Sequence, residues 1–203
     1  MQVKTRLIFS AVMLALAGSA GAADNLVEMG MADVNASVAG QSASSMEYAL
    51  SDYSLASGGT AYGGSVQTNL GLSVANLQDT HYSAFVGHEF DAGSFAIVPE
   101  LVAGYDSVGF AGTNAYSANR AGFNISVSTN LDAWLLSASA GYGRTFESAY
   151  PTGGGDYSSA SIGIRHQVGN GALGLRYGYE QLPLFSNVNI VENSLLLGYT
   201  LRF

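Results

Sequence analysis

Residues 192–203 read ENSLLLGYTLRF, and this final stretch of the chain decides the fold. Successive side chains of a β-strand point to opposite faces. The odd-numbered positions from 195 onward carry only large apolar or aromatic residues: Leu195, Leu197, Tyr199, Leu201 and Phe203. The even-numbered positions are small or polar apart from Leu196. One face therefore suits lipid and the other a polar lumen, which is the pattern of a membrane β-barrel strand.

The first 22 residues have the features of a secretory signal peptide. Lys4 and Arg6 precede an apolar run over residues 7–17, and Ala20 to Ala22 supply small residues for cleavage. The run is shorter than the roughly 20 apolar residues that a membrane-spanning helix needs. We therefore expect cleavage after Ala22, and residues 23–203 form a single transmembrane β-barrel domain. The expected location is the bacterial outer membrane.

Composition excludes some partners and supports short amphipathic strands. Loss of Lys4 and Arg6 with the signal peptide lowers the formal net charge from −8 to −10. This balance argues against a nucleic-acid partner, because phosphate binding needs clustered Lys and Arg. Without an apolar helix in the mature chain, a closed barrel is the way to cross lipid with all backbone groups paired. A soluble β-sandwich has the same alternation, but the signal peptide and the last strand favour the barrel.

Alternation and turn residues predict an all-β, up-and-down antiparallel barrel of ten strands. The expected strands are residues 31–39, 46–55, 60–70, 81–90, 94–105, 119–128, 133–144, 157–168, 172–179 and 192–203. Short links at 56–59, 91–93, 129–132 and 169–171 alternate with longer ones at 40–44, 71–80, 106–118, 147–156 and 181–191. Short turns are periplasmic in such barrels, so both termini are expected in the periplasm. Eight strands is the alternative, if the first hairpin does not span the membrane.

The same alternation of side chains along each strand predicts which charged residues face the lumen. They are Glu100, Arg120, Arg165, Arg176, Glu180 and Arg202. Buried charges persist only when they are paired, and we expect Arg176 to lie within reach of Glu100 or Glu180. An interior network that fills a narrow barrel is the preferred hypothesis, and the alternative is a selectivity constriction in a small pore.

Aromatic residues at the outward-facing strand positions are expected at the two membrane interfaces. They are Phe95, Tyr105, Trp134, Tyr142, Tyr177, Tyr179 and Tyr199.

The three His residues do not predict an enzyme. A barrel hydrolase needs a nucleophile, a His base and a polar group that orients the base. His81 is expected at the outer rim near Asp79 and Ser83, whereas His88 and His166 are expected near the periplasmic edge. No His pair has metal-ligand spacing and no acidic repeat has the form of a calcium loop. The sequence therefore predicts no catalytic residue, no metal site and no cofactor.

Several short segments resemble the YfaZ-type family of small outer-membrane proteins, and more loosely the OmpA, OmpX and opacity-type barrels. They are Gly40-Gln41, Glu47-Tyr48, Asp91-Ala92-Gly93, the run 176–179 and the terminal Phe203. The family has no assigned activity, so the resemblance implies fold and location and no catalytic residue. Its implied partners are the outer-membrane lipid and lipopolysaccharide, and the barrel-assembly machinery and periplasmic chaperones during biogenesis. The ending with Tyr199, Leu201 and Phe203 resembles the signal that the assembly machinery reads.

Three functions agree with these features. The first is a monomeric outer-membrane barrel with a structural or surface-interaction role. The alternative is a narrow, porin-like pore for small solutes, and the third is a lipid hydrolase embedded in the barrel.

Overall fold

The computed structural model describes the chain except for residues 1–21, 70–76, 111–112, 147–153 and 186–187. The described residues are almost entirely strand: β1 (Ala22–Val38), β2 (Gln41–Ala56), β3 (Thr60–Asn69), β4 (Leu77–His88), β5 (Phe90–Ala92), β6 (Phe95–Phe110), β7 (Thr113–Leu131), β8 (Trp134–Phe146), β9 (Asp156–Val168), β10 (Gly171–Phe185) and β11 (Val188–Arg202). Within these described ranges, no helix has the length and apolarity to cross a membrane.

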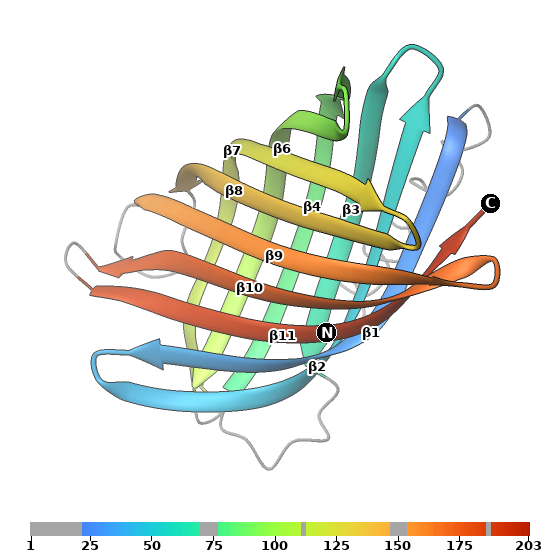
Figure 1. Cartoon of the computed structure of the whole chain (residues 1–203). Coiled ribbons are helices and arrows are strands. Elements are labelled where there is room, and N and C mark those ends of the chain that lie inside the picture. The colour runs from blue at the N-terminus through green and yellow to red at the C-terminus, as the bar shows by residue number, and fades with distance from the viewer. Residues whose placement is uncertain (1–21, 70–76, 111–112, 147–153, 186–187) are drawn as a thin grey trace.

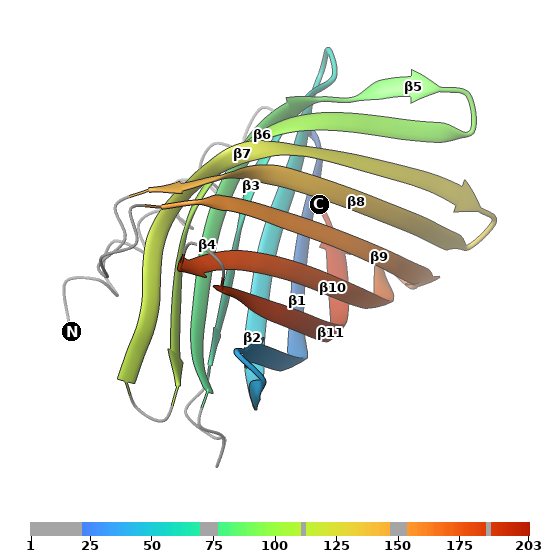
Figure 2. The same cartoon turned by 90° about the vertical axis from the view of Figure 1, so that its left-hand side faces the viewer.

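The strands form one antiparallel sheet that closes on itself. Neighbours in sequence are neighbours in the wall, β4 also pairs with β6, and β1 pairs with β11. Short β5 pairs only with the start of β6 and extends that edge of the wall beyond β4. The result is an up-and-down barrel with ten wall strands in the described part of the chain (Figures 1 and 2). Leu26 lies opposite Arg202, so the two ends of the described chain share one end of the barrel.

The ten predicted strands are confirmed, but several boundaries were wrong. Strand β1 begins at Ala22 instead of residue 31. The segments 106–118 and 181–191, predicted as loops, are mostly strand, since β6 reaches Phe110 and β10 reaches Phe185. Ala39 and Gly40 alone connect β1 to β2, with φ values of 49° and 80° that suit a tight hairpin turn.

These boundaries weaken the loop-length argument for the orientation. At the end away from the termini, only two residues separate β1 from β2, β6 from β7 and β10 from β11. These separations are as short as those at the terminal end between β7 and β8 and between β9 and β10. The periplasmic position of the termini therefore stays a prediction.

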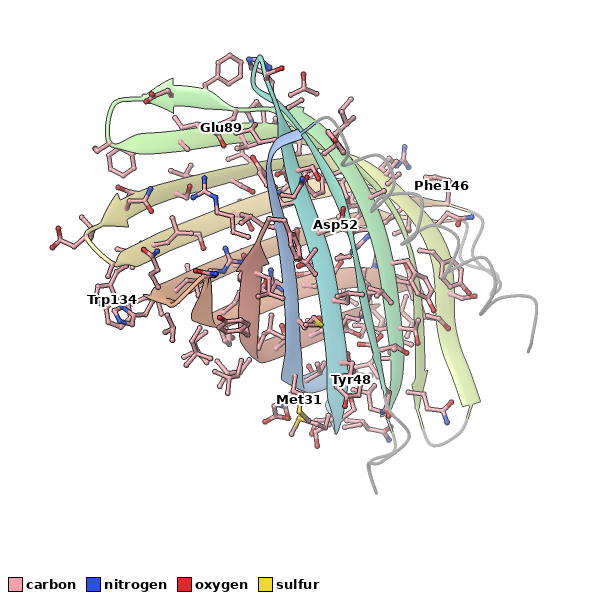
Figure 3. All side chains as sticks on the ribbon, turned by 90° about the vertical axis from the view of Figure 1, so that its right-hand side faces the viewer. Met31, Tyr48, Asp52, Glu89, Trp134 and Phe146 are labelled. Carbon is pink, nitrogen blue, oxygen red and sulfur yellow. The ribbon has the colours of Figure 1, made fainter. Side chains whose placement is uncertain are left out.

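The outer wall carries a band of exposed apolar side chains. In β11 Leu197 is 56% exposed whereas Leu196, on the opposite face, is 3% exposed, as the sequence predicted. Met31, Tyr48 and Trp134 lie on the outside of the wall (Figure 3). Soluble monomers rarely expose apolar surface on this scale, and moving one such side chain from water into lipid gains about 1.5–3 kcal/mol.

The polarity of the wall is reversed at the end away from the termini. There Asp33 and Asn35 of β1 face outward, while Val34 and Ala36 face inward. The inward residues form a single cluster, the apolar core, made of Ala32, Val34, Ala36, Leu77, Val108, Tyr116, Ala118, Tyr157, Leu182, Leu184, Ile190 and Leu196. Seven strands contribute to it, so it packs across the lumen. Because the strand predictions relied on apolar side chains at the outward positions, this reversed end of the wall was predicted as loops.

Candidate functional site

A cluster of seven ionisable side chains lies in the lumen next to the apolar core. This charge cluster consists of Glu47, Asp79, His81, Asp106, Arg120, Glu180 and Glu192. Strands β2, β4, β6, β7, β10 and β11 each contribute at least one member. All of these side chains point inward because strand alternation places them opposite the lipid-facing residues.

His81 is at the centre of the cluster and contacts three carboxylates. Its Nδ1 lies 2.7 Å from Oδ1 of Asp106, which is directly opposite it in the β4–β6 register. Its Nε2 lies 2.7 Å from Oδ1 of Asp79 and 3.1 Å from Oε2 of Glu192. Asp79 is two residues earlier on the same face of β4, whereas Glu192 arrives from β11. Register and barrel closure therefore bring together groups that are far apart in sequence.

Arg120 is the second cation of the cluster. It donates a hydrogen bond to Glu180, lies 3.5 Å from Oδ1 of Asp106, and stacks over the ring of Tyr157 at 5.3 Å from the centroid. The buried carboxylate of Glu47 accepts hydrogen bonds from Ser45 and Gln67, at 2.5 and 2.9 Å. Five carboxylates thus face one guanidinium and one imidazole.

A second ionic group lies nearer the terminal end. Glu28 Oε2 is 3.0 Å from Arg165 Nη2 and 3.7 Å from Arg176 Nη1. Glu100 accepts a hydrogen bond of 2.5 Å from Asn124. The prediction that Arg176 pairs with Glu100 or Glu180 was therefore wrong. Its partner Glu28 belongs to the part of β1 that precedes the predicted strand, so the sequence pattern did not assign it to the lumen.

The six predicted lumenal charges are divided among separate groups. Arg120 and Glu180 meet in the charge cluster, and Arg165 and Arg176 share Glu28. Glu100 is held by Asn124, and Arg202 is exposed at the end of β11, where it lines the mouth of the barrel.

Sequence reasoning missed most of the charge cluster. His81 was predicted at the outer rim, but it is buried in the lumen. Asp106 and Glu192 were at or beyond the predicted ends of their strands, so their shared face with His81 was not recognised. The one available signal was the Asp79-Thr80-His81 alternation, which places two polar side chains on one face of a strand.

Three cavities lined by described residues follow the lumen from the mouth to the charge cluster. The first, of about 400 Å³, is lined by Trp134, Arg165 and Arg202, and the second, of about 390 Å³, is lined by Glu28 and Glu100. They share the lining residues Leu26, Leu135, Arg165 and Thr200.

The third cavity, of about 190 Å³, is lined by His81, Arg120, Glu180 and Glu192. It shares Ser65, Ser139 and Ser161 with the second cavity. A polar vestibule therefore leads from the terminal end to the charge cluster, and the apolar core lies on the far side of that cluster.

The predicted interface aromatics all occupy strand positions that face outward. Phe95, Trp134, Tyr142 and Tyr177 are exposed, and Tyr105, Tyr179 and Tyr199 are partly buried. Trp134 stacks on His166 with ring centroids 4.3 Å apart. In the predicted assembly signal, Phe203 is exposed and its amide donates to Asn25 O at 3.0 Å. Their roles at a membrane interface and in assembly stay predictions.

No family model and no curated protein matches the chain. Solved structures do match. The outer membrane protease OmpT from Escherichia coli aligns with a TM-score of 0.57 and 6% identity over 89% of this chain and 96% of that one. The fold is that of an outer-membrane β-barrel. The β domain of the Bordetella autotransporter BrkA aligns with a TM-score of 0.50 and 12% identity over 89% of this chain and 98% of that one.

Neisserial surface protein A also matches, with a TM-score of 0.45 and 18% identity over 88% of this chain and 97% of that one. At these identities the matches to OmpT and to the BrkA β domain show the architecture of the chain and not its activity. The YfaZ-type resemblance stays a prediction.

Proposed function

We propose that the chain is a monomeric, integral outer-membrane β-barrel with a structural or surface-interaction role and a lumen that does not conduct ions. The apolar core carries this proposal. It closes the end of the barrel away from the termini with side chains such as Leu182 and Ile190, which are fully buried. Small barrels are commonly filled by side chains, and only wide ones leave an aqueous channel.

The outer-membrane location is supported by the exposed apolar band and by the fold, together with the predicted signal peptide. Lipid and lipopolysaccharide are the expected surroundings of this band. Biogenesis is expected to use the barrel-assembly machinery and periplasmic chaperones.

The pore alternative requires a hydrated path through the apolar core. An ion that leaves water for such an environment without paired partners pays a desolvation cost of many kcal/mol. The vestibule offers polar lining on one side of the core only, as far as the charge cluster. A conducting state would have to displace side chains such as Tyr116 and Leu182, which are packed together.

The hydrolase hypothesis gains no specific support. The ring nitrogens of His81 face carboxylates, whereas a hydrolase of this kind needs a hydroxyl nucleophile beside its base. The likeness to OmpT shows the fold alone. The absence of enzymatic activity stays a prediction.

Conductance of the purified barrel in planar bilayers tests the proposal. The wild type is expected to give no stable unitary currents. A double variant with the core opened, Tyr116→Ala with Leu182→Ala, should conduct if it remains folded, whereas Tyr142→Ala on the outer face should not. Stable wild-type channels would overturn the proposal in favour of the pore.

A further inference from the structure

Three members of the charge cluster present ligand atoms to one point. Asp79, His81 and Glu192 each offer one such atom, and all three atoms lie within 4.8 Å of one another. Zn²⁺ binds His nitrogen and carboxylate oxygen at about 2.0–2.2 Å, so its ligand atoms in a tetrahedral site lie about 3.3–3.6 Å apart. The distances of 2.7 and 3.1 Å from His81 Nε2 need to widen by less than about 1 Å to reach this spacing.

Two carboxylates of this trio have oxygens that lack a donor. Asp79 is 1% and Glu192 is 4% exposed, and in the described part of the chain both carboxylate oxygens of Asp79 and Oε1 of Glu192 have no hydrogen-bond partner. Buried polar atoms are nearly always satisfied, and a buried charge without a partner is costly. These oxygens therefore point to a positively charged ligand.

Asp106 holds the imidazole in the orientation that a metal ion requires. When Nδ1 donates its proton to Asp106 across 2.7 Å, the lone pair of Nε2 faces Asp79 and Glu192. A metal-bound His commonly donates its other ring N–H to a carboxylate, which fixes its tautomer. The pair His81–Asp106 has this geometry.

The net charge of the cluster also favours a cation at these three residues. Glu180 is paired with Arg120, and Glu47 is held by Ser45 and Gln67. With a neutral imidazole, the five carboxylates and one guanidinium of the charge cluster carry −4. A divalent cation beside Asp79 and Glu192 reduces this excess without disturbing the other pairs.

The vestibule supplies a route of entry. His81 and Glu192 line the third cavity, whose volume of about 190 Å³ is large enough for several water molecules. A hydrated cation arriving from the terminal end can exchange water for the three side chains and keep water at its remaining positions.

We propose that Asp79, His81 and Glu192 bind one divalent first-row transition-metal ion inside the barrel, with Asp106 as the positioning residue of His81. The mixture of one imidazole and two carboxylates suits Zn²⁺ or Mn²⁺ better than the all-oxygen ligand sets of Ca²⁺ and Mg²⁺. In the competing arrangement, a protonated His81 pairs with all three carboxylates and no metal binds.

The test uses the folded, chelator-treated barrel in detergent, titrated with Zn²⁺ by calorimetry and with Co²⁺ by visible absorption. The wild type should bind one ion per barrel, and Zn²⁺ should displace Co²⁺ whereas Ca²⁺ should not. Asp79→Asn and Glu192→Gln should each weaken binding more than about 100-fold, and Asp106→Asn by about 10- to 100-fold. Glu100→Gln is the matched control, a buried lumenal carboxylate outside the cluster, and should leave affinity unchanged.

Heat-modifiable migration on a gel verifies that each variant is folded. If the cluster variants fail to fold, the Co²⁺ spectrum of the wild type tests metal binding by itself. Co²⁺ bound by an imidazole and carboxylates gives visible absorption bands, and Zn²⁺ should abolish them by displacing Co²⁺. A folded wild type that binds neither ion at an excess over protein would overturn the proposal in favour of the protonated His81. Equal affinities for Asp79→Asn and Glu100→Gln would overturn it as well. Both results are independent of whether the lumen conducts.

Discussion

Removal of Arg120 tests whether the charge cluster stabilises the barrel through pairing. The Arg120 side chain is 11% exposed, hydrogen-bonds to Glu180 and lies 3.5 Å from the fully buried Asp106. Arg120→Ala leaves both carboxylates without this cation, and breaking a buried pair in this way typically costs about 3–5 kcal/mol. The barrel should therefore unfold at clearly lower urea concentration.

Arg144→Ala is the matched control, because the chain offers the same residue type in an exposed pair. Arg144 is 78% exposed and lies 3.5 Å from Asp156, and such pairs contribute about 0–1 kcal/mol. Urea unfolding in detergent can be followed by the fluorescence of Trp134, the single tryptophan. The double variant Arg120→Met with Glu180→Gln removes both members of the Arg120–Glu180 pair and should recover part of the loss. Equal losses for Arg120→Ala and Arg144→Ala would refute the paired-cluster reasoning.

Three further predictions use the same unfolding measurement. Leu175→Arg on the lipid face should cost about 2–4 kcal/mol near mid-membrane, whereas lumenal Ser161→Ala should cost under about 1 kcal/mol; equal losses would mean that the faces are inverted. Leu182→Ala in the apolar core should cost about 2–5 kcal/mol, and a loss below this range would indicate that the core is loosely packed. Arg176→Ala and Glu28→Gln should couple by about 0.5–3 kcal/mol in a double-mutant cycle, while strict additivity would show that the 3.7 Å contact does not stabilise the barrel.

The strands that cross the apolar band were predictable from sequence because lipid imposes a local rule. A residue at every second position must be apolar there, and this period of two is visible in residues 157–168 and 192–203 without knowledge of neighbours. Arg120, Arg165, Arg176 and Glu180 were assigned to the lumen for the same reason. Alternation also placed Leu196 on the inward face, although an apolar side chain by itself favours the lipid face.

Strand extensions outside the apolar band were not predictable by that rule. In the described residues of 106–118 and 181–191, apolar side chains such as Val108, Tyr116, Leu182 and Ile190 are buried in the lumen instead of facing outward, so the sequence pattern looks irregular. Only the hydrogen-bonded register with neighbouring strands shows that β6, β7, β10 and β11 continue. The extent of β1 was missed in the same way, and with it Glu28.

The sequence by itself determined that the chain is built of amphipathic strands with an apolar outer face, because side-chain alternation is a property of each strand alone. Which charges meet was decided only by the tertiary structure. Asp79 and Glu192 converge on His81, and Glu28 meets Arg176, because closure of the barrel and the stagger of its strands bring distant positions to one level of the lumen. That stagger is set jointly by all of the strand pairings, and no single segment of the chain encodes it.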